Sequence, residues 1–318
     1  MTTPNSLFRV KPVPFLIILF YVGVAVLILV FVLKAGTPVN KKVTVKADNP
    51  KKNIVEVNAP TAEEKETMNK IQETVVPKDG FKFSVKWGNT GKKLVENGAI
   101  DLEKFRKNYM DEKYKDDMTY LTEEKNDGIT VNADNAYFWV NTLWALGLNQ
   151  QSLVLEDMKK NYPRDLGNLA STGGWTLGAK PALELYGKET IIPLTVVQQE
   201  TVKKISAGIY RPCCNNSTAF PDCNHGMAAL GLVELMVSQN FSEEEIYRAV
   251  LAFNSYWFSQ TYVDLAYYFQ KNNNTTWADV DSKQVLSSEY SSAAGYKAIK
   301  AKIGNTPGVG GAGAACGA

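Results

Sequence analysis

The sequence has a single histidine and four cysteines in 318 residues, and its 35 basic residues nearly balance 33 acidic ones. One histidine excludes a metal site built from three histidines and any Ser-His-Asp triad that does not use this residue. A formal charge of +2 without a long basic run is not typical of proteins that bind nucleic acid through its phosphates. We therefore expect no nucleic-acid partner. An aromatic content of 11% is too high for a wholly disordered chain, so a folded core is expected.

Charged residues are absent from Val13 to Leu33, where the sequence reads VPFLIILFYVGVAVLILVFVL. About 20 apolar residues suffice for a helix to cross roughly 30 Å of hydrocarbon. A cleaved signal peptide has a shorter apolar region followed by a small-residue cleavage site, and neither feature is present. The sequence therefore predicts a short N-terminal tail over 1–12 and an uncleaved transmembrane signal anchor over 13–34, with the lipid bilayer as its partner.

The side of the membrane on which the rest of the chain lies depends on two opposed rules. Only Arg9 and Lys11 precede the apolar run, whereas six lysines follow it between residues 34 and 52, which favours the cytoplasm for those lysines. Long domains are nevertheless translocated largely regardless of charge, and a basic leader before one apolar helix is typical of export. We expect a single-pass protein of the cell membrane with its C-terminal domain outside the cytoplasm. The alternative is a domain held at the cytoplasmic face.

Phenylalanine, tyrosine and tryptophan are all absent from residues 35–79, which contain four prolines among many lysines, asparagines and threonines. Such a composition buries too little apolar area to offset the entropy of ordering, so it predicts an extended, flexible stalk. A capping box that starts at Thr61 allows one short helix within it. All six tryptophans follow the stalk and indicate one domain over 80–303. Residues 304–318 are rich in glycine and alanine and predict a flexible tail.

Helix signals dominate the domain over 80–303. Capping boxes begin at Thr195 and at Ser242, and each precedes a run with helical spacing of apolar residues. Runs with the alternation typical of strands are few and short, and the best are 81–87 and 128–132. The predicted fold class is mainly α, with at most a minor sheet.

Two acidic residues, Glu234 and Asp264, fall inside apolar helical runs. A carboxylate in such surroundings is costly unless it has a partner, and an unpaired one can mark a functional site. We expect hydrogen bonds between helices to satisfy both residues.

Three of the four cysteines and the single histidine gather within thirteen residues, as Cys213, Cys214, Cys223 and His225. Thiolate and neutral imidazole are the side chains that suit zinc and copper(I) best, and four of them can form a tetrahedral site. The intervening residues are turn formers that bring the cysteines together, and Asp222 can accept a hydrogen bond from the imidazole. The sequence predicts a metal site that holds zinc structurally or handles copper(I).

Two alternatives to a metal site stay open. Outside the cytoplasm, Cys213 or Cys214 can pair with Cys223 while the third thiol stays free or joins Cys316, which predicts a disulfide-closed scaffold for a protein partner. In the other alternative, an activated cysteine attacks a disulfide of a partner and a neighbouring cysteine resolves it, which predicts a thiol exchange protein.

Residues 209–258 resemble the small helical module of cytochrome c maturation thiol oxidoreductases. In that family an Arg-Cys-x-x-Cys segment precedes an apolar helix and a Ser-x-Glu-Glu-Ile capping turn. Here Arg211, Cys213 and Cys214 stand near the first motif, and residues 242–246 match the turn. The two cysteines are adjacent rather than spaced, and adjacent thiols form a strained eight-membered ring when oxidised. The resemblance implies a membrane-anchored module that presents cysteines outside the cytoplasm.

Overall fold

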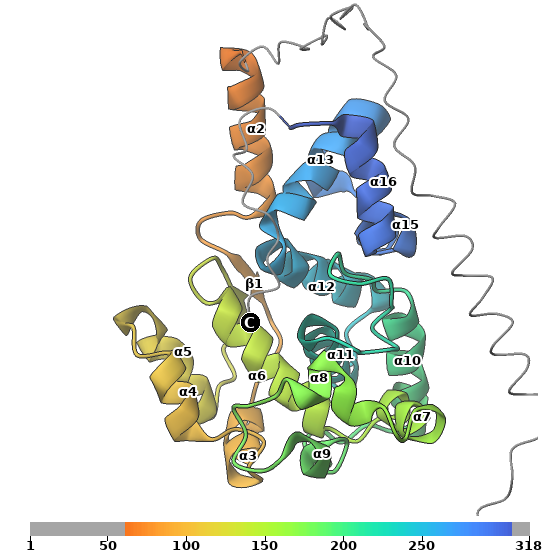
Figure 1. Cartoon of the computed structure of the whole chain (residues 1–318). Coiled ribbons are helices and arrows are strands. Elements are labelled where there is room, and N and C mark those ends of the chain that lie inside the picture. Colours follow the sequence, from red (N-terminus) through yellow and green to blue (C-terminus); the bar gives the residue numbers. More distant parts are fainter. Residues whose placement is uncertain (1–60, 307–318) are drawn as a thin grey trace, which may run out of the picture. The chain divides into compact units, whose positions relative to one another are not determined.

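The structure, a computed structural model, describes residues 61–306. The predicted N-terminal tail (1–12), transmembrane anchor (13–34) and most of the stalk lie outside this range. Within residues 61–306, no helix combines the length and the apolar character that a membrane crossing requires. This part of the chain is mainly helical and contains one two-stranded sheet, which confirms the predicted fold class for the domain (Figure 1).

The helices and strands cover most of the described chain. Along the chain they are α2 (Ala62–Val75), β1 (Phe81–Phe83), α3 (Thr90–Glu96), α4 (Leu102–Asn108), η1 (Glu112–Tyr114), α5 (Lys115–Met118), η2 (Thr119–Leu121), β2 (Ile129–Val131), α6 (Ala136–Asn149), α7 (Leu153–Asn161), η3 (Leu166–Asn168), α8 (Ala170–Gly173), α9 (Ala182–Leu185), α10 (Val196–Ala207), α11 (Asn224–Ser238), α12 (Glu243–Trp257), α13 (Ser259–Asn273), η4 (Trp277–Asp279), α14 (Ser282–Val285), α15 (Ser288–Ser291) and α16 (Ala293–Ile303).

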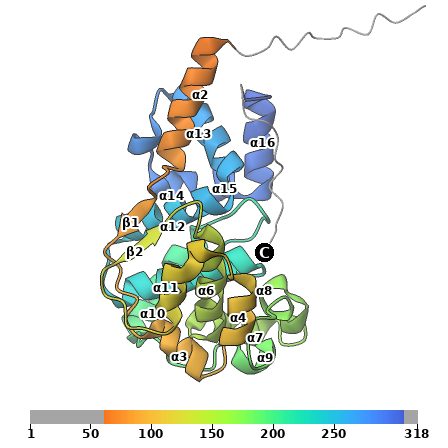
Figure 2. The same ribbon diagram turned by 90° about the vertical axis from the view of Figure 1, so that its left-hand side faces the viewer.

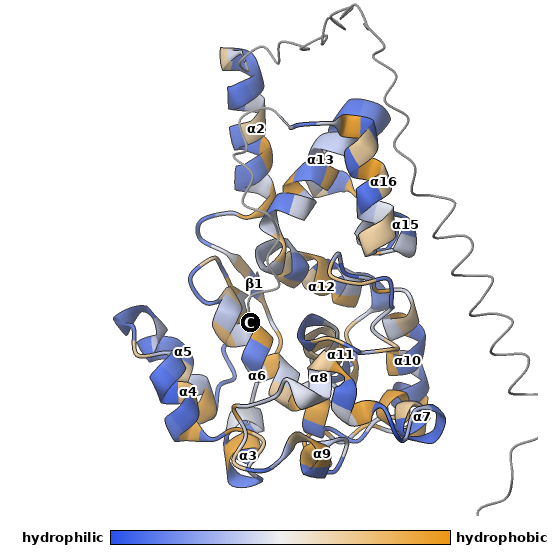
Figure 3. Cartoon of the chain, in the orientation of Figure 1, coloured by the Kyte–Doolittle hydropathy of each residue, from blue (hydrophilic) through white to orange (hydrophobic). Residues whose placement is uncertain are grey.

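Helix α2 is the short helix that the sequence allows within the stalk. Thr61 and Glu64 form the predicted capping box at its start. Hydrophilic residues cover most of α2 in Figure 3, but Met68, Ile71 and Val75 lie on one side and are buried. This side packs against α13 and η4, and Figure 2 shows α2 alongside α13. The folded body therefore begins before residue 80, because three apolar side chains at helical spacing are enough to dock α2.

The minor sheet consists of the two segments that the alternating pattern predicts. Strand β1 pairs with β2 in antiparallel orientation, and Phe81 lies opposite Val131 while Phe83 lies opposite Ile129. The two phenylalanines are half-buried, whereas both residues of β2 in these pairs are buried.

Helices α10 and α12 begin at the capping boxes that the sequence predicts. The Thr195 hydroxyl accepts a hydrogen bond from the Gln198 N–H, and the Ser242 hydroxyl accepts one from the Glu245 N–H. Both helices pack against α11, and α12 also contacts α6. These contacts fix the segment between α10 and α11, which carries the cysteine cluster.

The centre of the core is the contact between α6 and α11, which is the most extensive contact between two helices of the described chain. Two glycines, Gly147 of α6 and Gly231 of α11, let the backbones approach closely. A Cβ atom at Gly147 would overlap the Met227 carbonyl oxygen, and one at Gly231 would overlap the Leu143 carbonyl oxygen. Glycine is required at both positions for this reason.

Replacing Gly147 by alanine should therefore lower the free energy of unfolding by about 1–3 kcal/mol, the usual cost of overpacking a core. Chemical denaturation followed by circular dichroism measures the change. Gly167→Ala is the matched control, because a Cβ atom there would meet only a side-chain carbon of Leu183 at 3.4 Å, an ordinary contact. Equal stability of the two variants would show that α6 and α11 do not pack through their glycines.

The two acidic residues in apolar runs have different surroundings. Asp264 of α13 is buried and accepts hydrogen bonds from Tyr296 and Lys300 of α16, each at 2.7 Å, so the prediction of a bond between helices is confirmed. Thr306 donates to the same carboxylate at 2.6 Å, which holds the start of the predicted tail in place. Glu234 is less well satisfied. Both of its carboxylate oxygens are buried and neither forms a hydrogen bond of ordinary geometry in the described chain. Burial raises its pKa well above the usual value, and the Ser152 side chain, at the start of α7, opposes this only in part.

Candidate metal centre

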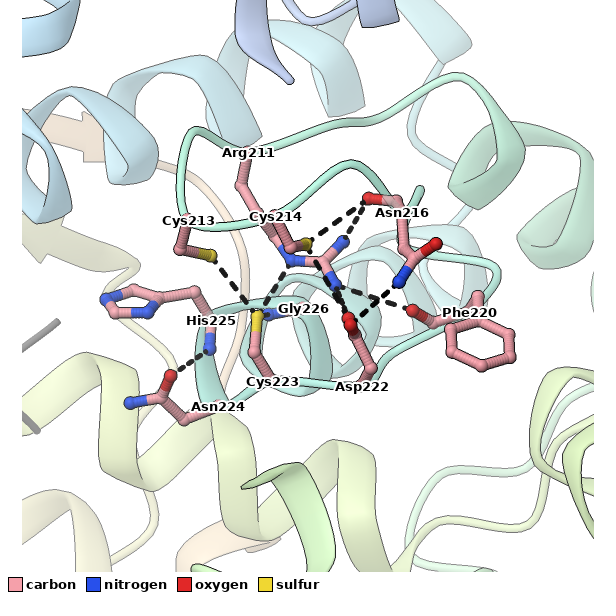
Figure 4. Close-up of polar contacts among 10 residues, drawn as sticks. All are labelled: Arg211, Cys213, Cys214, Asn216, Phe220, Asp222, Cys223, Asn224, His225 and Gly226. Carbon is pink, nitrogen blue, oxygen red and sulfur yellow. Dashed lines mark hydrogen bonds and ion pairs between the residues drawn. The ribbon is translucent and has the colours of Figure 1, made fainter. Parts of the chain in front are cut away.

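The cysteine cluster lies on the segment that connects α10 to α11, at the N-terminus of α11 (Figure 4). Cys223 is the N-cap residue of α11, and its sulfur accepts a hydrogen bond from the Gly226 N–H at 3.4 Å. The preceding turn reverses the chain direction, as Asn215, Asn216, Ser217 and Pro221 predict, so that Cys213 and Cys214 come back to Cys223. The cluster therefore has one rigid member on a helix and two members on a loop.

The three sulfur atoms form a compact group. Cys213 Sγ lies 3.3 Å from Cys223 Sγ, and the sulfurs of Cys213, Cys214 and Cys223 all lie within 4.8 Å of one another. All three residues are half-buried, and no disulfide joins them in the described structure. The prediction that these cysteines are brought together is confirmed. Cys316 lies outside the described residues.

The thiols have unequal acidity. The neighbouring Cys213 and Cys214 thiols, together with the Arg211 guanidinium, hold the pKa of the Cys223 thiol far below its usual range. The contacts with Cys214 and Cys223, together with burial, raise the pKa of Cys213 well above it. Cys213 lowers the pKa of Cys214, but Cys223 and burial outweigh this effect and raise it to about 11. The Arg211 guanidinium and the Gly226 N–H both donate to Cys223 Sγ, so Cys223 is the cysteine of the group whose thiolate is best stabilised.

Arg211 holds the cluster together from inside. Its side chain is fully buried, and its Nε donates to Cys223 Sγ at 3.0 Å. Its remaining nitrogens donate to the carbonyl oxygens of Asn216 and Phe220, so one guanidinium spans the whole loop. A Cβ atom at Gly226 would collide with this guanidinium, which explains the glycine in the first turn of α11. Nothing in the local sequence pattern predicts this role of Arg211.

Asp222 forms an ion pair with Arg211 and does not bond to His225. Its carboxylate forms an ion pair with the guanidinium at 2.6 Å and accepts further hydrogen bonds from the Asn216 amide at 2.8 Å and the Cys214 thiol at 3.6 Å. The prediction that Asp222 orients the imidazole is therefore wrong, because its donors are Arg211, Asn216 and Cys214, and the His225 Nδ1 has no hydrogen-bond partner in the described chain. The sequence does contain a signal of this ion pair: Arg211 lies shortly before the two adjacent cysteines, and Asp222 lies directly before Cys223.

His225 lies beside the cluster rather than inside it. Its ring packs against Phe258, with ring centroids 4.4 Å apart, and against the edge of Trp257. Its nitrogens are not among the ligand atoms that lie within 4.8 Å of one another, and Figure 4 shows the ring to the left of the three sulfurs. Burial lowers its pKa to about 4, so the ring is neutral at pH 7. Its Nδ1 is buried without a hydrogen-bond partner in the described chain.

No protein-family model, curated protein or solved structure matches this chain. The resemblance of residues 209–258 to cytochrome c maturation proteins accordingly stays a prediction. The function has to be inferred from the geometry of the cluster.

Proposed function

We propose that the domain binds one soft metal ion, zinc or copper(I), through the sulfurs of Cys213, Cys214 and Cys223. The spacing of the three sulfurs carries this proposal. Zinc binds thiolate at about 2.3 Å, so two sulfurs on one tetrahedral ion lie about 3.8 Å apart. The observed spacing, 3.3 Å for one pair and at most 4.8 Å for the others, brackets that value. Small side-chain rotations are enough to place all three sulfurs on one ion.

The surroundings of the sulfurs also suit a metal. Three thiolates carry more negative charge than a zinc or copper(I) ion neutralises, and the buried guanidinium of Arg211 supplies further positive charge next to Cys223. The hydrogen bonds from Arg211 to the loop carbonyls hold the loop in one conformation, which lowers the entropic cost of assembling the metal ligands.

The proposal is tested by titrating the purified, reduced full chain with Cd²⁺, a spectroscopic substitute for zinc, and with copper(I) in competition with a chelator. We expect one ion per chain, with thiolate-to-metal charge-transfer absorption for Cd²⁺. Absence of this absorption in a chain whose thiols are shown to be reduced would refute the proposal.

His225 remains the proposed fourth ligand. A buried ring nitrogen without a hydrogen-bond partner is costly, and a metal ion would satisfy it. The ring would have to rotate away from Phe258 to reach the ion. Zinc prefers four ligands, whereas copper(I) is also stable with three sulfurs, so the role of His225 bears on which metal is bound.

Replacing His225 by phenylalanine should weaken zinc binding at least about tenfold if the imidazole is a ligand, because one of four donors is lost. Phenylalanine keeps an aromatic ring against Phe258 and Trp257, so thermal unfolding of the metal-free variant shows whether the fold is retained. Trp257→Phe is the control, since it alters the same aromatic contact and keeps the imidazole, and the one hydrogen bond that it removes, from the indole N–H to the Ala136 carbonyl, does not involve the cluster. Unchanged zinc affinity in His225→Phe would leave a site of three sulfurs.

Thiol exchange is the second candidate, and the 3.3 Å separation of Cys213 and Cys223 favours it. The Cys223 thiolate would attack a disulfide of a partner and release one partner thiolate, which takes the proton of the Cys213 thiol. The resulting Cys213 thiolate would then attack Cys223 Sγ and displace the second partner thiolate as the Cys213–Cys223 disulfide forms. Incubation with oxidised glutathione, followed by a count of free thiols, measures the exchange. A Cys213→Ser variant should accumulate the mixed disulfide if this reaction occurs.

We further propose that the predicted anchor over 13–34 attaches the protein to the cell membrane and that the domain lies outside the cytoplasm. The uncharged apolar run and the basic leader support this location. Protease added to intact cells should remove the domain. Protection in intact cells, with digestion after lysis, would place it in the cytoplasm.

A further inference from the structure

A groove of about 780 Å³ opens between β1, α12 and the segment 277–283, and none of the residues that line it belongs to the cysteine cluster. Figure 2 shows β1 and β2 beside α12 and α14. Phe81, Phe83, Leu251 and Trp277 give the groove an apolar lining. Its volume falls within the range of sites that bind small molecules or short peptide segments, about 300–1,000 Å³.

Strand β1 presents an unpaired edge next to this groove. In an antiparallel pair, residues alternate between those that bond to the partner strand and those whose N–H and C=O point away from it. The Thr130 carbonyl of β2 accepts hydrogen bonds from Asn135 and Trp139, so Thr130 and its partner Lys82 form a pair without mutual hydrogen bonds. The N–H and C=O of Lys82 therefore point away from β2. The groove is lined by residues of β1 and by none of β2, which places it on the free side of the sheet.

The groove also carries uncompensated negative charge. Two cations line the groove, Arg248 and Lys283. Arg248 forms an ion pair with Glu244, and Lys283 forms one with Glu243, which also pairs with Lys204. Both lining cations are therefore neutralised. Two further lining residues have no ionic partner in the described chain. Asp279 accepts a hydrogen bond only from the Thr276 hydroxyl, and Asp281 only from a backbone N–H.

From these observations we propose that the groove binds an extended peptide segment of a partner protein, in which apolar residues alternate with lysine or arginine. The segment adds to β1 as a third strand and bonds to the backbone of Lys82. Its apolar side chains contact Phe81 and Phe83, and its basic side chains face Asp279 and Asp281. Main-chain bonds to a strand edge supply affinity in this mode of recognition, and charge complementarity supplies selectivity.

Fluorescence anisotropy tests this proposal with a labelled synthetic peptide of sequence Lys-Val-Lys-Ile-Lys-Val-Lys-Ile and the full chain. We expect saturable binding that is weakened at least tenfold when glutamate replaces the lysines. The same loss is expected when alternate peptide nitrogens are methylated, because methylation removes the donors that a third strand needs. No binding at millimolar concentration, or equal binding of the lysine and glutamate peptides, would overturn the proposal.

Substitutions in the protein locate the site. The Asp279→Asn, Asp281→Asn double variant should weaken binding about tenfold, and asparagine retains the cap that Asp281 provides for α14. Asp111→Asn is the matched control, because Asp111 is also an exposed N-cap residue, but it does not line the groove. Unchanged affinity in the double variant would overturn the proposal. Self-association of the chain that the double variant abolishes would assign the groove to a second copy and would also overturn it.

Discussion

Replacing Cys223 by serine should raise the dissociation constant for Cd²⁺ about a hundredfold or more. Cys223 contacts Cys213 at 3.3 Å and Arg211 at 3.0 Å, and it is the cysteine with the strongly lowered pKa. A serine hydroxyl is a hard, protonated oxygen that binds soft metals poorly. It still caps a helix well, so α11 should keep its N-terminus. The charge-transfer absorption of the Cd²⁺ complex measures the change.

Cys316→Ser is the matched control for this prediction. It removes the fourth cysteine of the chain and leaves the three proposed ligands intact, so the Cd²⁺ affinity should be unchanged. Wild-type affinity in Cys223→Ser would contradict the three-sulfur site. Loss of binding in Cys316→Ser would instead show that the ligand set includes the C-terminal cysteine.

The parts of the fold that could be predicted depend on interactions within a few residues. The capping boxes at Thr61, Thr195 and Ser242 join residues three apart, and each marks the start of a helix in the structure. The two strands can also be predicted, because the alternation of apolar and polar residues that marks them extends over only a few positions. The docking of α2 on α13 could not be predicted, because it depends on contacts between residues about 200 positions apart.

In the candidate site, too, the features set by neighbouring residues could be predicted, and those set by distant residues could not. The three sulfurs could be predicted to meet because the loop that joins them is short and rich in turn formers. The partners of Arg211 could not be, because the loop carbonyls that it bonds become available only once the turn has formed. The position of His225 depends on Phe258, which belongs to a different helix, so no local pattern reveals that the ring packs there.

Replacing Arg211 by methionine should lower the free energy of unfolding by about 3–5 kcal/mol, the usual effect of removing one partner of a buried ion pair. The Arg211 side chain is fully buried, and Asp222 is only 22% exposed. Methionine fills most of the volume, but it leaves the Asp222 carboxylate and the Cys223 thiolate without their positive partner. Urea denaturation of the reduced, metal-free chain measures the loss.

Two further variants separate the charge of Arg211 from its geometry. Arg211→Lys keeps the positive charge but cannot reach Cys223, Asp222 and the loop carbonyls together, because an ammonium lacks the planar fork of donors. We expect an intermediate loss of stability. The double variant Arg211→Met, Asp222→Asn removes both charges and should be more stable than Arg211→Met alone, since no unpaired carboxylate remains. If Arg211→Met and the double variant were equally unstable, the ion pair would contribute little, and the hydrogen bonds to the loop carbonyls would be the interaction that holds the cysteines in place.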